Sequence, residues 1–312
     1  MPDTAVARSA HPPRALMPTG VGFADDAYVP VEQLSVSVLD FGFTRSDVTY
    51  DVVHVWEGRF FRLEHHLDRF EKSMAALRMA IPYDRDAMRA ILMECVRRTG
   101  LRDAYVAMVC TRGRPPPGVR DLRQCRNRFI AYALPFVWIA SPEKQRSGLS
   151  AVIASRPRIP PQSVDPTVKN YHWLDMDRAL LDAYDAGADT VILPSFEGTV
   201  TEGPGFNAFA VIGETVITPD SGVLEGITRQ TVIDLCRRNG VAVEIRPVPL
   251  AEFRDADEIF LASTAGGVMP VTRLDGRILG NGAPGPVTGR IRELYWAWHR
   301  DEAETTAIDY DG

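Results

Sequence analysis

The sequence has few cysteines and no long apolar run, and both scarcities exclude classes of protein. None of its four cysteines forms a C-x-x-C pair; they are Cys95, Cys110, Cys125 and Cys236. We therefore expect reduced thiols in a cytoplasmic protein rather than a disulfide framework. No apolar run approaches the roughly 20 residues that span a bilayer, so we expect no membrane partner.

Positive charge is also scarce, because 41 acidic residues outnumber 35 basic ones and the net charge is −6. This balance argues against a nucleic-acid partner, since such proteins usually carry a basic footprint. The histidines form no H-E-x-x-H motif, and we expect no metal site. Residues 1–20 contain no apolar core segment, which predicts a flexible tail rather than a secretory signal.

The length of 312 residues, with 45% hydrophobic and 24% charged residues, is typical of a globular protein with two domains. A connector-like segment lies near mid-chain at Pro135–Gly148. We therefore expect a tail at 1–20, an N-terminal α+β domain at 21–137, a connector at 138–148 and a C-terminal domain at 149–312.

Strands and helices are predicted from the spacing and type of the apolar residues. The predicted strands are Leu34–Val38, Tyr50–Trp56, Arg59–Leu63, Ala104–Cys110, Phe129–Leu134, Leu149–Ala154, Thr190–Leu193, Phe206–Ile212, Val241–Val248 and Glu258–Leu261. The predicted helices are Glu64–Met79, Asp86–Thr99, Leu174–Ala186, Thr228–Asn239 with Thr228 as its N-cap, and a last helix from about Pro286 to His299. Hairpins mixed with helices favour the α+β class, and the proline-rich stretch 112–127 is predicted to be a long loop.

One glycine-rich motif is misleading. Gly203-Pro-Gly205-Phe-Asn-Ala208 matches G-x-G-x-x-A, the dinucleotide fingerprint. That fingerprint needs a helix after the glycines, whereas the residues that follow here predict a strand. We therefore reject a dinucleotide site.

Four weaker signals each have an ordinary structural alternative that stays open. Gly226 leads into a helix whose first N–H groups could bind phosphate, and the turn Ser263–Gly267 could form an anion nest. Lys169 precedes an aromatic run that could desolvate its amine, and Glu202 could pair with a cationic ring nitrogen. Together these are the parts of a pyridoxal-phosphate site.

Several longer segments of the chain resemble those of a known family. The segments LDFGFTRSDVTYDVVHVWEGRFFRLEHHLDRF, DPTVKNYHW, TEGPGFN, LEGITR, ASTAGGVMP and GPVT occur in this order between about Ser35 and Trp298. They resemble the fold-type IV pyridoxal-phosphate aminotransferases, which are branched-chain aminotransferase-like two-domain proteins with mixed sheets and flanking helices. Within that group the chain is most similar to the (R)-selective amine transaminases. The resemblance implies pyridoxal 5'-phosphate as cofactor, bound by the C-terminal domain.

The resemblance also implies roles for individual residues. Lys169 would hold the cofactor as a Schiff base and move the Cα proton, and Glu202 would face the pyridine nitrogen. Arg69 would bind the phosphate through a forked contact. The backbone of Ile227 and Thr228 and the hydroxyl of Thr264 would complete the phosphate cup, and Leu224 would pack on a ring face.

The substrate pockets are implied in the same way. Tyr50, Trp173 and Ala265 would line them, with Tyr105 near the entrance. Ala107 stands where branched-chain aminotransferases have a carboxylate-binding arginine, which favours amines without a carboxylate there. Arg120 matches a mobile arginine of the amine transaminases, although a solvated basic loop is its alternative. Arg45 replaces a histidine common in that group.

The function implied is a ping-pong transfer of an amino group from a primary, (R)-configured amine to a keto acid such as pyruvate. The alternatives are a D-amino-acid or branched-chain amino-acid aminotransferase and, in another reaction class, an aminodeoxychorismate lyase. The expected partners are the small-molecule amine and keto acid and a second copy of the chain, because members of this group are homodimers.

Overall fold

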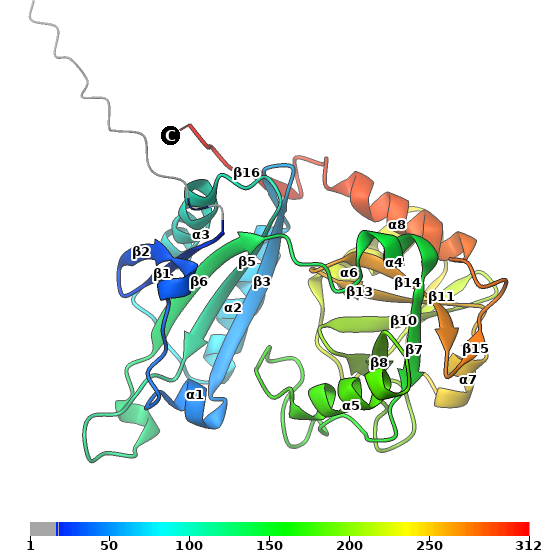
Figure 1. The fold of residues 1–312 in the computed structure, drawn as a ribbon, viewed down its shortest axis with the longest axis horizontal. Coiled ribbons are helices and arrows are strands. Elements are labelled where there is room, and N and C mark those ends of the chain that lie inside the picture. Colours follow the sequence, from blue (N-terminus) through cyan, green and yellow to red (C-terminus); the bar gives the residue numbers. More distant parts are fainter. Residues whose placement is uncertain (1–16, 18, 312) are drawn as a thin grey trace, which may run out of the picture.

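The computed structural model describes residue 17 and residues 19–311, so most of the predicted tail at 1–20 lies outside the described residues. Two sheets with helices against them make up the fold, which confirms the α+β class (Figure 1). Among the described residues no helix is long and apolar enough to cross a membrane.

The first sheet has seven strands in the order β16-β4-β3-β5-β6-β1-β2, and every neighbouring pair is antiparallel. Its strands are β1 (Val21–Ala24), β2 (Ala27–Pro30), β3 (Val48–Trp56), β4 (Arg59–Phe61), β5 (Ala104–Thr111), β6 (Arg128–Pro135) and β16 (Thr305–Ala307). The predicted hairpin is confirmed: Trp56 of β3 pairs with Arg59 of β4 across Glu57 and Gly58. Both turn residues have positive φ, as this tight turn requires.

The second sheet is mixed, with the strand order β12-β11-β10-β13-β14-β7-β8 and two short strands, β9 and β15, beside β10 and β14. Its strands are β7 (Leu149–Ile153), β8 (Thr190–Ile192), β9 (Glu202–Gly203), β10 (Phe206–Ile212), β11 (Thr215–Thr218), β12 (Val243–Ile245), β13 (Glu258–Ser263), β14 (Gly267–Leu274) and β15 (Arg277–Ile278). A strand does follow Gly205, as the rejection of a dinucleotide site requires.

The described α-helices are α1 (Phe41–Arg45), α2 (Leu63–Ala76), α3 (Arg85–Thr99), α4 (Pro142–Ser147), α5 (Leu174–Asp185), α6 (Ile227–Arg238), α7 (Leu250–Arg254) and α8 (Pro286–Trp298). Two further turns of 3-10 helix lie at Val31–Gln33 and Leu122–Gln124. Helices α2 and α3 pack on the first sheet, whereas α6 and α8 pack against β13 and β14 of the second sheet and α5 packs against β8 (Figure 1).

Apolar cores fill both halves and also join them. One core lies between the first sheet and α2 and α3, and includes Phe60, Leu67 and Phe70. A second core lies under α6 and α8, and includes Phe61 of the first sheet together with Tyr295. Strand β16 also returns the C-terminal end of the chain to the first sheet, so residues 305–307 join the sheet of the N-terminal half. The predicted division at 138–148 stays a prediction.

The strand predicted at Val241–Val248 is shortened to Val243–Ile245, and two further sequence predictions are wrong in detail. Leu34–Val38 is not a strand: Leu34 packs over Gly22, while Val38 is 68% exposed and pairs with no strand of the described chain. Alternating apolar residues predict a strand only where a sheet edge is available to pair with them. The other error concerns α6, which begins at Ile227 with Gly226 as N-cap, so Thr228 lies inside the first turn.

Candidate active site

A cavity of about 400 Å³ lies between the two sheets, and it brings together most of the predicted site residues. Its lining comes from β3, α2, β5, the segment after β6, the loop before α5, the turn between β9 and β10, the start of α6 and the turn between β13 and β14. Eleven predicted residues line it: Tyr50, Arg69, Tyr105, Lys169, Trp173, Glu202, Leu224, Ile227, Thr228, Thr264 and Ala265.

Lys169 is fixed through its backbone rather than by a helix or strand of its own. Its carbonyl oxygen accepts hydrogen bonds from the hydroxyl of Thr49 at 2.7 Å and from the N–H of Tyr50 at 3.2 Å. Its N–H donates to the hydroxyl of Ser73 on α2 at 3.4 Å. The loop that carries the lysine is therefore held against the first sheet, although the cavity also includes residues of the second.

The amine of Lys169 has surroundings that favour its neutral, nucleophilic form. Burial and the positive charge of Arg69 lower the pKa of Lys169 while Asp51 and Glu202 act in the opposite direction, and the net result is a pKa of about 8. Its Nζ atom lies 4.5 Å from the centre of the Tyr50 ring. An amine with this pKa is partly deprotonated near neutral pH and can attack a carbonyl carbon or accept a proton.

Glu202 is the buried carboxylate of the cavity, with 5% of its surface exposed. Its Oε1 atom accepts a hydrogen bond from Nε of Arg158 at 3.2 Å, and its Oε2 atom accepts one from the N–H of Leu224 at 2.9 Å. Burial raises the pKa of Glu202, while Arg158, Leu224 and Lys169 oppose that rise. The donors surrounding this carboxylate favour its ionised form.

Arg69 reaches the cavity from α2 and pairs with the fully buried Asp51 of β3. Its Nε and Nη2 atoms donate to the two carboxylate oxygens at 2.7 and 2.8 Å, and Nη1 donates to the carbonyl of Glu225 at 3.1 Å. Nδ1 of His66 contacts the same carboxylate at 2.8 Å. Burial alone would raise the pKa of Asp51, but Arg69 and His66 hold it well below its usual range.

The start of α6 forms one wall of the cavity and suits an anion. Ile227 and Thr228 are its first two residues, and the first N–H groups of a helix have no partner within the helix. A Cβ atom on Gly226 would lie 2.1 Å from the side-chain oxygen of Asn207, so only glycine fits there. The amide nitrogen of Asn207 also donates to the carbonyl of Leu224 at 2.9 Å, which fixes the approach to the helix.

The turn between β13 and β14 forms a second wall beside this helix start. Thr264 and Ala265 lie in it, and the N–H of Ala265 donates to the hydroxyl of Ser263 at 3.2 Å. The same hydroxyl donates to the carbonyl of Gly205 at 2.7 Å. The turn is therefore tied to the Gly-Pro-Gly segment that follows Glu202.

Aromatic and aliphatic side chains occupy another part of the lining. Tyr50, Tyr105 and Trp173 are there as predicted, and Val137 and Ile139, which lie between β6 and α4, line the cavity with them. Ala107 packs in the apolar cluster of Tyr50 and is not among the residues that line the cavity.

Arg45 and Arg120 do not meet the other predicted residues in this chain. Both line a separate hollow of about 1260 Å³ between α1 and the loop 113–128. The guanidinium of Arg45 lies over the ring of Phe41 instead. No described residue lines both spaces, so neither arginine contacts the cavity in this structure.

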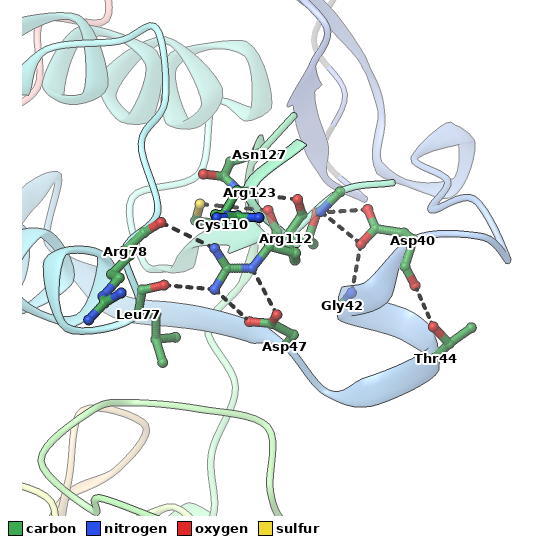
Figure 2. A network of polar contacts seen from close by, with 12 residues as sticks. Asp40, Gly42, Thr44, Asp47, Leu77, Arg78, Cys110, Arg112, Arg123 and Asn127 are labelled. Carbon is green, nitrogen blue, oxygen red and sulfur yellow. Dashed lines mark hydrogen bonds and ion pairs between the residues drawn. The ribbon is translucent and has the colours of Figure 1, made fainter. Parts of the chain in front are cut away.

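A polar network fixes the base of that loop (Figure 2). Arg112 donates to both carboxylate oxygens of Asp47, at 2.8 and 3.0 Å, and to the carbonyl of Leu77 at 2.7 Å. Asp40 accepts a hydrogen bond from the N–H of Gly113 at 3.1 Å. A Cβ atom on Gly113 would overlap the carbonyl oxygen of Arg126, so the loop closes only with glycine there.

A comparison with known families identifies the family of the chain that forms this cavity. The model of the family described as amino-transferase class IV matches residues 49–274, which contain the lysine, the buried carboxylate and both of these walls. The chain belongs to the class IV aminotransferases. It is therefore an aminotransferase of the fold-type IV, pyridoxal-phosphate-dependent group.

Individual class IV aminotransferases are similar to the chain over most of its length. A protein of Methanocaldococcus jannaschii named for branched-chain amino-acid aminotransferases is 32% identical over 276 residues, 88% of this chain and 94% of that protein. The D-alanine aminotransferase of Bacillus licheniformis is 31% identical over 263 residues, 83% of this chain and 90% of the enzyme. The branched-chain amino acid aminotransferase of Thermobaculum terrenum, solved in its pyridoxal-phosphate form, has a TM-score of 0.83 at 29% identity and covers 94% of this chain and 99% of its own.

The donor set of the cavity fits pyridoxal 5'-phosphate. A buried amine of lowered pKa, a buried carboxylate, an arginine and a helix start that only glycine permits line one space. When bound, the cofactor supplies an electron sink for the substrate Cα. Lys169 would accept and return the Cα proton, Glu202 would face the ring nitrogen, and Arg69 with the α6 start would hold the phosphate; these roles stay predictions.

Three polar residues of this site were not predicted from the sequence. Asp51 orients Arg69, Arg158 pairs with Glu202, and Asn207 fixes the approach to α6. The one signal available for Asp51 was its charge inside an otherwise apolar strand, since β3 is buried along almost its whole length.

Proposed function

We propose that this aminotransferase moves an amino group from a primary, (R)-configured amine to a keto acid such as pyruvate by a ping-pong mechanism. The observation that supports it is the state of the cationic side chains in the cavity. Among the described lining residues these are Arg69, Arg158 and Lys169. Arg69 pairs with Asp51 and is assigned to the cofactor phosphate, and Arg158 pairs with Glu202 and Asp175, so this assignment leaves no arginine of the cavity for a substrate carboxylate.

The rest of the lining supports an uncharged substrate. Tyr50, Tyr105, Val137, Ile139 and Trp173 provide aromatic and aliphatic surface. Burial raises the pKa of Tyr50 and Tyr105, so both hydroxyls stay neutral. Such a surface binds an aryl or alkyl group by apolar contact. The preference for the (R) configuration rests on the resemblance to the (R)-selective amine transaminases.

The test compares donors with one acceptor. Initial rates are measured with 2-oxobutyrate as acceptor and (R)-1-phenylethylamine, (S)-1-phenylethylamine, D-alanine or L-leucine as donor. We expect the highest kcat/KM for the (R)-amine. A higher value for D-alanine or L-leucine would assign the chain to the amino-acid aminotransferases, the activity named for its relatives. Release of pyruvate from aminodeoxychorismate without an acceptor would instead indicate the lyase.

We also infer that the active form is a homodimer. Large apolar side chains are exposed on two elements that lie on the same side of the molecule (Figure 1). They are Val38, Leu39 and Phe43 at α1, and Leu174, Leu181 and Tyr184 on α5, each between 53% and 72% exposed. A second copy would cover them, and it could bring its Arg45 and Arg120 toward the cavity.

Sedimentation velocity tests this inference. We expect a dimer for the wild type and a shift toward monomer for Leu181→Glu. Ile278→Glu is the matched control, because Ile278 is also about half exposed but lies on β15, away from these elements. A monomer under conditions in which the enzyme is active would contradict the dimer. The cytoplasmic location stays a prediction.

A further inference from the structure

Arg158 occupies a position between three parts of the site. Its backbone N–H donates to the carbonyl of Pro194 at 2.8 Å, which fixes the residue near the end of β8. Its guanidinium donates to Oε1 of Glu202 at 3.2 Å and to Oδ2 of Asp175 at 2.7 Å. Arg158 is 8% exposed, so these contacts form with little competition from water.

Asp175 anchors the other end of this contact. It lies in the first turn of α5, where a negative charge is favoured by the helix dipole. Besides Arg158, its Oδ2 atom accepts the N–H of Ile159 at 2.8 Å. The guanidinium is therefore held in place from the α5 side, independently of Glu202.

A buried carboxylate without a counter-charge takes up a proton instead of staying ionised. Glu202 has one cationic partner within hydrogen-bond distance among the described residues, Arg158, and one neutral donor, the N–H of Leu224. Lys169 acts on it through space alone. The carboxylate thus depends on Arg158 for its charge and, through Oε1, for its orientation.

We propose that Arg158 is a positioning residue that keeps the carboxylate of Glu202 ionised and directed into the cavity, with Asp175 as its anchor. A carboxylate in that state would accept a hydrogen bond from the protonated ring nitrogen of the cofactor, whereas a protonated carboxyl group has no negative charge to pair with it. The consequence for the cofactor rests on the proposed role of Glu202, but the ionisation of Glu202 in the cofactor-free protein does not.

The first experiment titrates Glu202 in the cofactor-free protein by infrared difference spectroscopy. Each protein is compared with its own Glu202→Gln derivative, which isolates the signal of this carboxyl group. In Arg158→Gln we expect the pKa of Glu202 to lie about one pH unit or more above the wild-type value. The matched control is Arg156→Gln, because Arg156 pairs with Asp182 on the same helix but does not touch Glu202. An unchanged titration in Arg158→Gln would overturn the proposal.

Asp175→Asn keeps the proposal testable if Arg158→Gln does not fold. Here Arg158 keeps its charge but loses the carboxylate that holds its guanidinium in place, so we expect the pKa of Glu202 to rise, by less than in Arg158→Gln. A fall or no change would overturn the anchoring role.

Cofactor affinity provides the second readout. At about pH 7 we expect Arg158→Gln to bind both pyridoxal phosphate and pyridoxal about tenfold more weakly than the wild type, since one pKa unit corresponds to a tenfold change. The affinity should recover as the pH rises through the new pKa of Glu202. A shifted titration with unchanged affinity would contradict the assignment of Glu202 to the ring nitrogen and leave its pairing with Arg158 intact.

Discussion

The Nε and Nη2 atoms of Arg69 lie 2.7 and 2.8 Å from the two carboxylate oxygens of Asp51. This contact uses one edge of the guanidinium and leaves N–H groups of Nη1 and Nη2 available to a ligand. Because Asp51 is fully buried, fixed also by His66 and part of β3, the guanidinium is oriented before any ligand arrives. An arginine prepared in this way suits a phosphate, which it can bind through two parallel hydrogen bonds.

The first prediction follows from that orientation. We expect Arg69→Gln to weaken pyridoxal-phosphate binding by about 10- to 100-fold, the value of a charge-assisted hydrogen bond, and to leave pyridoxal binding nearly unchanged. The measurement is the dissociation constant of each compound. Arg112→Gln is the matched control: Arg112 is equally buried and pairs in the same way with Asp47, but it lies outside the cavity (Figure 2). Equal losses for the two compounds would exclude Arg69 as the phosphate ligand.

The second prediction concerns the amine of Lys169. The sequence contains three lysines, Lys72, Lys144 and Lys169, and the other two are exposed. After reductive methylation with a ¹³C label, NMR titration of the cofactor-free protein should show one lysine signal that titrates near pH 8. We expect that signal to disappear in Lys169→Arg. Three lysine signals that all titrate near the ordinary lysine pKa would contradict the desolvated site.

The third prediction tests the wall at the start of α6. A Cβ atom on Gly226 would meet the side chain of Asn207, so we expect Gly226→Ala to displace the helix start and lower pyridoxal-phosphate affinity at least about tenfold. Gly289→Ala is the control, because a Cβ atom there meets nothing and alanine favours the interior of α8. Wild-type affinity in Gly226→Ala would show that this helix start does not hold the phosphate.

The fourth prediction concerns the buried pair His54 and His299, whose Nε2 atoms are 2.7 Å apart. Nδ1 of His299 contacts the carbonyl of Tyr295, so this nitrogen carries the proton and both rings are neutral. Burial lowers the pKa of His299 to about 4 from about 6.5 in the unfolded chain. As the pH falls, His299 therefore takes up its proton in the unfolded chain at a higher pH than in the folded protein, and this favours unfolding. Stability is therefore full above about pH 6.5 and falls as the pH drops toward 4.

Urea unfolding measures this loss. For His299 alone we expect about 3 kcal/mol of free energy of unfolding to be lost across that range. The loss should be smaller in His299→Gln and unchanged in His65→Gln, which removes an exposed histidine. A pH dependence in His299→Gln identical to the wild type would contradict the buried neutral pair.

How much the sequence could predict differs between the fold and the site. The β3–β4 hairpin, the end of α3 and the start of α8 were predictable from single residues. Gly58 permits the hairpin turn, Gly100 ends α3 and Pro286 begins α8. The strand predicted at Leu34–Val38 is wrong because a strand needs a neighbouring strand to pair with. The alternation of apolar residues does not show whether such a neighbour is present. Strand β14 was missed, since it follows a glycine turn and contains Pro270.

The site residues divide in the same way. Lys169, Glu202 and Arg69 stand in motifs that short sequence segments carry, and the structure brings them to one cavity. Arg158 stands in no such motif, and the segment that contains Asp51 and Arg69 does not show that they pair, because the partners of Arg158 and Asp51 lie 44 and 18 residues away and only the folded chain makes the contact. Arg45 and Arg120 were placed with the substrate by resemblance, whereas in the single chain they line another hollow.

The measurement that tests the central claim most directly is the visible absorption of the protein with pyridoxal phosphate, recorded before and after (R)-1-phenylethylamine is added. We expect a visible band from cofactor bound at Lys169, and loss of that band when the amine is added. Lys169→Ala should show neither that band nor turnover. A band that persists with the (R)-amine but is lost with D-alanine or L-leucine would contradict the amine as donor, and no band at all would contradict the assignment of the cofactor site.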